Sequence, residues 1–193
     1  MPNTNAITNT DITKLATDNG IEFAALKAVI NVESSGRGFD AATGKIMIQF
    51  EPHWFKRIAK NLDDGGGQRT WAKNKVEKQS AEWLAFNDAF SINPDAAMQS
   101  TSIGLMQVMG FHYQKLGFAS VGAMWDYGKE SEANQADIGL RFIKAKGNEK
   151  MFKALKTKDW ATFAFYYNGA QYKKFNYDNR LADAYKKALA PGK

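Results

Sequence analysis

Segments with helical periodicity fill most of this chain, and Gly, Asn or Pro residues interrupt them at short intervals. Residues 10–33 predict two helices, because an Asn19-Gly20 pair separates two apolar-periodic runs. Thr10 or Asp11 is the expected N-cap of the first helix. This spacing favours a mainly helical domain built from many short helices.

Further helices are expected after residue 75, with a break at Asn93-Pro94. We also expect a Gly-punctuated helix from Leu105 to Met109, and helices over residues 131–146, 151–169 and 179–189. One segment differs, because apolar residues alternate with others over residues 46–50, which predicts a short strand that ends near Pro52. The expected class is therefore α+β, mainly α-helical.

The composition excludes several kinds of chemistry. The chain has no Cys and two His residues, so disulfides, thiol nucleophiles and zinc sites built on several His or Cys ligands are not expected. No cofactor or metal is implied. The first 14 residues lack the basic and apolar regions of a signal peptide, and no apolar run is long enough to span a membrane.

The net charge of +6 is unevenly distributed, because residues 141–193 hold 13 Lys and Arg residues against four Asp and Glu residues. A basic third of this kind suits a polyanionic partner, such as nucleic acid or a cell-wall polymer, and it is equally compatible with a solvated basic face. The basic clusters are short and scattered, and no nucleic-acid motif is present, so we expect no nucleic-acid partner.

Glu33 occupies an unusual position at the end of the second predicted helix. On a helical wheel it shares one face with four apolar residues, Phe23, Leu26, Val29 and Ile30. Burial and the negative end of the helix dipole both raise the pKa of a carboxyl group. Glu33 is therefore a candidate general acid, and the alternative is a carboxylate that caps the following turn.

A second carboxyl group could lie opposite. Glu51 closes the predicted strand, and Asp40 is another option. Two carboxyl groups across a cleft are the typical arrangement for glycoside hydrolysis. The alternative for Glu51 is an ion pair with Arg37 or Arg57.

Aromatic rings suit sugar binding, because the apolar face of a pyranose ring stacks on them. The candidates are Trp54, Trp125, Tyr166, Tyr167, Tyr172 and Tyr177. The alternative for each is an ordinary packing role in the core.

Five segments together resemble a known family. They are "AALKAVINVESSGRGF", "IQFEPHWF", "STSIGLMQVMGFHY", "DWATFAFYYNGAQY" and "YDNRLADAYKKA". In this order they are similar to the N-acetylmuramidase catalytic domain of phage endolysins, within the lysozyme-like superfamily. "GLMQ" and "YNG" also resemble the cleft motifs of goose-type lysozymes and lytic transglycosylases.

The resemblance implies one lysozyme-like domain over residues 11–190, after an N-terminal tail of residues 1–10, with a small β-lobe across a substrate cleft. It implies that Glu33 is the general acid. The segment Ser102, Gly104, Leu105, Met106 and Gln107 would line the cleft, and Tyr167 and Asn168 would contact substrate from the other side. A water, or the muramoyl N-acetyl group, would then attack C1, with Glu51 as the candidate base, although lytic transglycosylases of this superfamily manage with one glutamate. One departure is Ala170-Gln171, where lytic transglycosylases commonly carry Ala-Gly.

The resemblance implies hydrolysis of the β-1,4 bond between N-acetylmuramic acid and N-acetylglucosamine in peptidoglycan. One alternative is a lytic transglycosylase that forms a 1,6-anhydro product. The alternatives of another class are a non-catalytic wall-binding or virion structural module and a nucleic-acid binder. We expect a monomer without stable membrane insertion. It would remain in the host cytoplasm until its release to the periplasm and cell wall, where the basic C-terminal third would add affinity for the wall.

Overall fold

The computed structural model describes residues 6–33, 37–60, 62, 64–76 and 78–190. Its N-terminal elements are α1 (Asn9–Asp18), α2 (Phe23–Glu33), β1 (Ile48–Phe50), α3 (Pro52–Ala59), η1 (Gly65–Gly67), α4 (Thr70–Lys73), α5 (Gln79–Ile92) and α6 (Pro94–Gln99). They are followed by β2 (Thr101–Ile103), β3 (Val108–Met109), η2 (Gly110–His112), α7 (Val121–Glu130), α8 (Glu132–Lys144), α9 (Glu149–Thr157), α10 (Trp160–Asn168), η3 (Tyr172–Phe175) and α11 (Tyr177–Leu189). Helix α2 ends at Glu33, as the sequence predicts.

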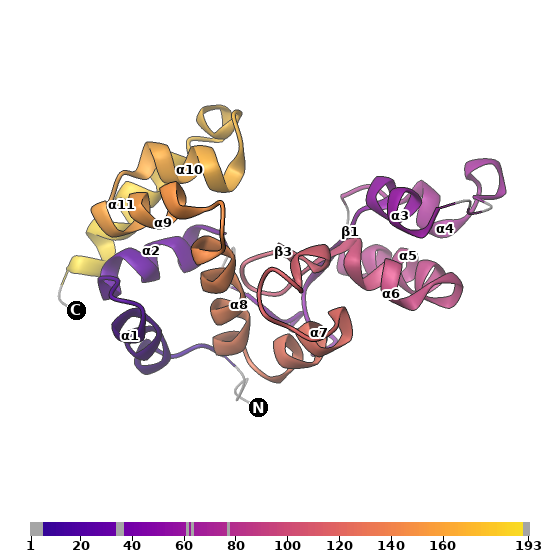
Figure 1. Cartoon of the computed structure of the whole chain (residues 1–193), viewed down its shortest axis with the longest axis horizontal. Coiled ribbons are helices and arrows are strands. Elements are labelled where there is room, and N and C mark those ends of the chain that lie inside the picture. Colours follow the sequence, from indigo (N-terminus) through magenta and orange to yellow (C-terminus); the bar gives the residue numbers. More distant parts are fainter. Residues whose placement is uncertain (1–5, 34–36, 61, 63, 77, 191–193) are drawn as a thin grey trace.

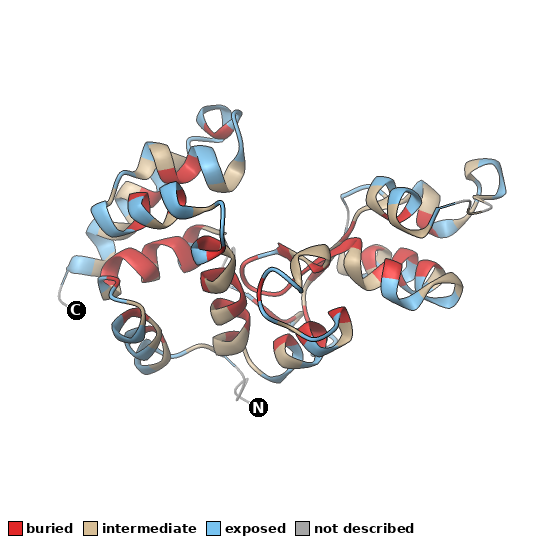
Figure 2. Ribbon diagram, viewed as in Figure 1, coloured by how far each residue is buried: buried red, intermediate tan, exposed pale blue. Residues whose placement is uncertain are grey.

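Helix α2 forms the centre of the larger lobe. It is apolar on nearly all sides, and Figure 2 shows it almost entirely buried. A helix of this kind needs neighbours around it. Helix α11 packs along it, α1 and α9 also contact it, and α10 packs on α9 and α11. Because α2 is a core helix, Glu33 stands where the core meets the surface.

The smaller lobe holds α3 to α6 and lies at the opposite end of the molecule from α9 to α11 (Figure 1). Within the described residues, three short strands form an antiparallel sheet in the order β1-β2-β3. Ile48 and Phe50 are buried, whereas Met47 and Gln49 are half-buried on the other face of the strand. The expected α+β class, mainly helical with a small β-lobe, is confirmed.

The start of α1 differs from the prediction. Thr8 is the N-cap, rather than Thr10 or Asp11, so the helix begins inside the segment expected as a tail. The Thr8 hydroxyl accepts from the Asp11 N–H, and the Asp11 carboxylate accepts from the Thr8 N–H at 2.9 Å. This reciprocal pair of hydrogen bonds is a capping box, and it makes Thr8 the N-cap of the helix.

Residues 105–109 do not form the expected helix. They belong to a hairpin in which β2 pairs with β3 and Ile103 lies opposite Val108. The connecting turn needs left-handed backbone, with φ of 68° at Gly104 and 47° at Gln107. Another predicted helix, over residues 151–169, is split into α9 and α10 by Lys158, which is left-handed with φ of 58°. In the described part of the chain, no helix combines the length and apolarity needed to cross a membrane.

Candidate active site

Glu33 faces a hollow between the two lobes. The hollow has a volume of about 210 Å³ and is lined by Glu33, Arg37, Met47, Ile48, Gln49, Val76, Gln79, Glu82, Gly104 and Gln107. These residues come from the end of α2, from β1, from α5 and from the hairpin turn. Of the predicted site residues, Glu33, Gly104 and Gln107 therefore lie together.

The environment of Glu33 favours its neutral form. Burial raises the pKa of the Glu33 carboxyl to about 7. Two groups act in the opposite direction: the Asn168 side-chain amide donates to Glu33 Oε1 at 3.1 Å, and Arg180 supplies a positive charge. Burial outweighs both, so the carboxyl is protonated in a large fraction of molecules near neutral pH.

Tyr167 ties α10 to the hairpin turn. Its hydroxyl donates to the Met106 carbonyl at 2.9 Å, and its ring stacks on Phe163 at 5.4 Å between centroids. Burial and the nearby Glu33 raise the pKa of the Tyr167 hydroxyl well above its ordinary value, so it stays a donor. The adjacent residue, Asn168, is thereby fixed opposite Glu33.

Gln107 is held in a strained backbone conformation. Its φ of 47° is uncommon for a residue with a side chain and costs on the order of 1 kcal/mol. The side chain compensates, because Ser102 Oγ donates to Gln107 Oε1 at 2.9 Å and Gln107 Nε2 donates to the Gly104 carbonyl at 2.8 Å. This network orders the polar end of Gln107 at the wall of the hollow.

Three of the predicted cleft residues, Ser102, Leu105 and Met106, are buried and do not line the hollow. The Met106 side chain is 2% exposed and packs against Gly139, where even a Cβ atom would lie 2.4 Å from Met106 Cγ. Ser102 is also buried and contacts Gln107 rather than the hollow. The structure thus gives them a supporting position.

Glu51 does not line the hollow, but it accepts a hydrogen bond from Gln49, which does. Gln49 Nε2 donates to Glu51 Oε1 at 2.6 Å, and His53 Nδ1 lies 3.5 Å from Glu51 Oε2. The alternative considered for Glu51, an ion pair with Arg37 or Arg57, is not found among the described residues. Glu51 remains on the Gln49 side of the strand, because residues two apart share a face.

Asp40 and Glu82 are two further carboxyl groups whose positions bear on the choice of a second catalytic group. Asp40 accepts from the Ala42 N–H at 2.7 Å within a turn and lines a different hollow, beside Trp83. Glu82 lines the Glu33 hollow, although no sequence pattern pointed to it. Its Oε2 accepts from the Phe50 N–H at 2.8 Å, which ties α5 to β1. In the described ranges, no group of three or more His, Asp or Glu side chains is arranged to hold a metal ion.

The aromatic candidates divide into core and surface residues. Trp125 is 2% exposed and stacks on Phe86, so it is a core residue rather than a sugar platform. Tyr172 is also buried, whereas Tyr166 is 41% exposed. The remaining two already have partners for their rings: Trp54 lies 4.6 Å from Phe111, and Arg180 lies 4.9 Å from the centre of Tyr177.

The contact between Asn168 and Glu33 can be tested without any substrate. Replacing Asn168 with Ala removes a donor to the ionised carboxyl, so the pKa of Glu33 should rise above its wild-type value. NMR titration of the Glu33 side-chain carboxyl carbon measures this shift. Asn87→Ala, at an exposed site, is the control and should leave the titration unchanged. An unchanged or lowered pKa in Asn168→Ala would contradict the contact.

The chain is similar to known proteins over most of its length. A sequence model of the N-acetylmuramidase family matches residues 22–189. The crystal structure of the Burkholderia AP3 phage endolysin has a similar fold, with a TM-score of 0.84 and 32% sequence identity. The similarity covers 97% of this chain and 72% of that endolysin. No curated protein matches the chain in a sequence search.

The family match spans α2 with Glu33, the sheet, the hairpin turn and α10 with Asn168. The structural match adds the same arrangement of helical and β lobes over nearly the whole chain. The chain therefore belongs to the N-acetylmuramidase family and is a glycoside hydrolase that acts on peptidoglycan.

Proposed function

We propose that this chain cleaves the β-1,4 bond between N-acetylmuramic acid and N-acetylglucosamine, with Glu33 as the general acid. The observation that carries this assignment is the half-buried carboxyl of Glu33, whose pKa is raised to about 7 in a hollow between the lobes. A carboxylic acid that is still protonated near neutral pH can give a proton to the departing glycosidic oxygen.

Glu33 first hydrogen-bonds to the bridging oxygen and transfers its proton as the bond from C1 to that oxygen breaks. The carboxylate left behind needs stabilisation at that moment. The Asn168 amide, 3.1 Å away, and the positive charge of Arg180 supply it. Contacts that oppose protonation of Glu33 in the resting enzyme thus favour proton transfer in the reaction.

The hairpin turn supplies the sugar contacts. Gly104 shapes this turn, because its φ of 68° favours glycine and because a Cβ atom there would lie 2.7 Å from the Gln135 side chain. Gln107 Nε2 uses one of its two hydrogens for the Gly104 carbonyl, and the second can donate to an N-acetyl or hydroxyl oxygen. Ser102, Met106 and Tyr167 act by holding this turn and Asn168 in place.

A water molecule then attacks C1, and Glu51 is the proposed base. Glu51 directly follows β1 and projects to the same side as Gln49, which lines the hollow. Its side chain keeps an exposed fraction of 27%, which leaves it accessible to a water.

Glu51→Gln should slow turnover by roughly 10²–10⁴-fold with little change in melting temperature, because an amide cannot take the proton but can still accept from Gln49. Steady-state cleavage of soluble glycan oligomers and a thermal melt measure the two effects. A lower melting temperature with normal turnover would make Glu51 a structural residue instead.

The bond-cleaving outcome is tested by digesting purified peptidoglycan in ¹⁸O-labelled water and analysing the products by mass spectrometry. Hydrolysis places labelled oxygen at C1 of the reducing-end muramic acid. A lytic transglycosylase would leave unlabelled 1,6-anhydro ends, and a non-catalytic module would leave no glycan products. The N-acetylmuramidase match favours the first outcome over the other two.

The likeness to a phage endolysin also supports a place in the lytic cycle. The proposed enzyme accumulates as a monomer in the host cytoplasm and reaches the wall when a separate membrane-permeabilising protein acts. Fractionation of infected cells before and at lysis tests this sequence, because the protein should leave the cytoplasmic fraction only at the onset of lysis.

A further inference from the structure

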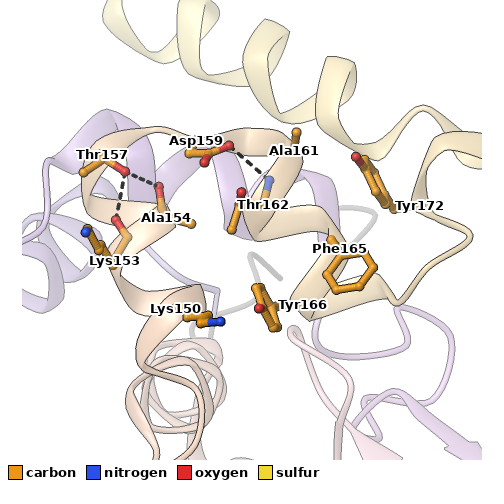
Figure 3. A pocket seen from close by; sticks show the side chains of 10 residues that line it. All are labelled: Lys150, Lys153, Ala154, Thr157, Asp159, Ala161, Thr162, Phe165, Tyr166 and Tyr172. Carbon is orange, nitrogen blue, oxygen red and sulfur yellow. Dashed lines mark hydrogen bonds between the residues drawn. The ribbon is translucent and has the colours of Figure 1, made fainter.

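A second hollow lies between α9 and α10, and it shares no lining residue with the Glu33 hollow. It has a volume of about 500 Å³ and is lined by Lys150, Lys153, Ala154, Thr157, Asp159, Ala161, Thr162, Phe165, Tyr166 and Tyr172. Figure 3 shows Lys150 from α9 and Phe165 and Tyr166 from α10 turned toward the same space. None of these residues is needed for the chemistry proposed at Glu33.

Two aromatic side chains in this hollow are unusually exposed. Phe165 is 46% exposed and Tyr166 is 41% exposed, while Tyr172 is buried. Phe165 and Tyr166 pack edge to face at 5.3 Å between centroids, so both rings keep a defined orientation. Exposed aromatic rings in a concave surface mark a binding site more often than chance placement does.

The charge of the hollow is positive. Lys150 and Lys153 are exposed, and neither forms an ion pair with any residue that the structure describes. Asp159 is the acid in the lining, and its carboxylate is already used as the N-cap of α10, accepting from the Thr162 N–H at 3.1 Å. Hydrogen bonds from the Thr162 side chain and from the Thr162 N–H hold the pKa of Asp159 below its ordinary value. Two lysines without an ion-pair partner among the described residues therefore line the same hollow as two exposed rings.

We propose that this hollow is a second, non-catalytic binding site for peptidoglycan, the substrate class of the same enzyme. Phe165 and Tyr166 would stack on a sugar ring, and Lys150 and Lys153 would pair with the carboxylates of the peptide stems. Peptidoglycan presents sugars and carboxylates together, which matches rings and ammonium groups in one hollow. This inference rests on the proposed function for its choice of ligand.

Helix α10 connects the two sites. Thr162, Phe165 and Tyr166 share one face, since residues three and four apart are neighbours on a helix. Asn168, at the end of the same helix, contacts Glu33. Thr162 and Asn168 are separated by about 9 Å along the axis at 1.5 Å per residue. A glycan strand bound in the second hollow would therefore keep the wall close to the Glu33 cleft. This raises the effective concentration of substrate at Glu33.

The test uses the full chain with Glu33→Gln as background, so that binding is measured without cleavage. Lys150→Glu with Lys153→Glu should weaken cosedimentation with purified peptidoglycan sacculi, stripped of phosphate polymers, by about tenfold. The matched control is Lys186→Glu with Lys187→Glu, which changes the charge equally on exposed residues of α11. Equal loss in both double variants would overturn the site in favour of a general charge effect.

The aromatic part needs its own variant. Tyr166→Ala should weaken sacculus binding even at raised ionic strength, where pairing between exposed charges is screened. Sacculi whose carboxylates have been amidated should bind wild-type and lysine variants equally weakly. Binding that survives amidation would overturn the carboxylate as the ligand.

Cleavage assays separate this site from the proposed function. With Glu33 restored, the Lys150 and Lys153 variants should cleave soluble oligomers too short to reach α9 at the wild-type rate, and should lyse intact walls about tenfold more slowly. If the proposed function is wrong, wild type cleaves neither substrate. Cosedimentation with sacculi still tests the second binding site independently of cleavage. Loss of short-oligomer cleavage in the lysine variants would contradict a separate site.

Discussion

Glu33→Gln should reduce glycan cleavage by about 10²–10⁴-fold and at the same time stabilise the folded protein. The activity is lost because glutamine has no proton to give to the glycosidic oxygen. It keeps the carbonyl oxygen that can accept from Asn168, so the local hydrogen bond survives. Binding of peptidoglycan should therefore persist while cleavage does not.

The gain in stability follows from the pKa of Glu33, which is about 7 in the folded chain against 4.5 for the ordinary group. A raised carboxyl pKa means that the folded state binds the proton more tightly, so wild type loses stability as pH rises from 4.5 toward 7. At about 1.4 kcal/mol per pKa unit, the loss reaches about 3.5 kcal/mol at alkaline pH. The variant lacks this penalty.

Denaturant unfolding at about pH 4 and about pH 8 measures the effect, with the free energy of unfolding extrapolated to water. The variant should match wild type at the acid pH and exceed it at the alkaline pH. In wild type, cleavage should fall as pH rises through about 7, because the acid form of Glu33 disappears. A variant no more stable than wild type at about pH 8 would show that Glu33 carries no raised pKa.

Helix α2 and its terminal carboxyl could be predicted because both depend on local information. The spacing of apolar residues over residues 21–33 marks a buried helix face, and Glu33 falls on that face. The structure confirms burial as the main cause of the raised pKa. The partner of Glu33 lies 135 residues away, so no local pattern could join them. Asn168 came only from the likeness of "YNG" to cleft motifs of related enzymes.

The hairpin at residues 101–109 was predicted wrongly for a physical reason. Its strands are two and three residues long, and such short apolar runs fit helical and strand periods alike. The turn also depends on left-handed backbone at Gln107, which sequence does not announce for a residue other than Gly or Asn. The position of Gln49 in the hollow could have been predicted, because strand alternation places it on the open face of the strand. The position of Arg180 near Glu33 depends on tertiary packing alone.

Gln135→Leu should lower the free energy of unfolding by roughly 2–6 kcal/mol and reduce cleavage with it. Gln135 is 1% exposed on α8. Its Oε1 accepts from the Leu105 N–H at 2.8 Å, and its Nε2 donates to the Gly128 carbonyl at 2.9 Å. Leucine would leave both buried backbone groups without a partner, at about 1–3 kcal/mol each. The loss is large beside a typical total stability of about 5–15 kcal/mol.

The activity should fall because the Leu105 N–H anchors the turn that carries Gln107. Gln114→Leu is the matched control, since Gln114 is exposed and the same substitution there should change stability by less than about 0.5 kcal/mol. Chemical denaturation measures the free energy of unfolding. Cleavage of short glycan oligomers, measured under conditions where the variant is folded, gives the effect on activity separately. If folded Gln135→Leu cleaves at the wild-type rate, the turn keeps its geometry without this side chain, and Gln135 serves stability alone.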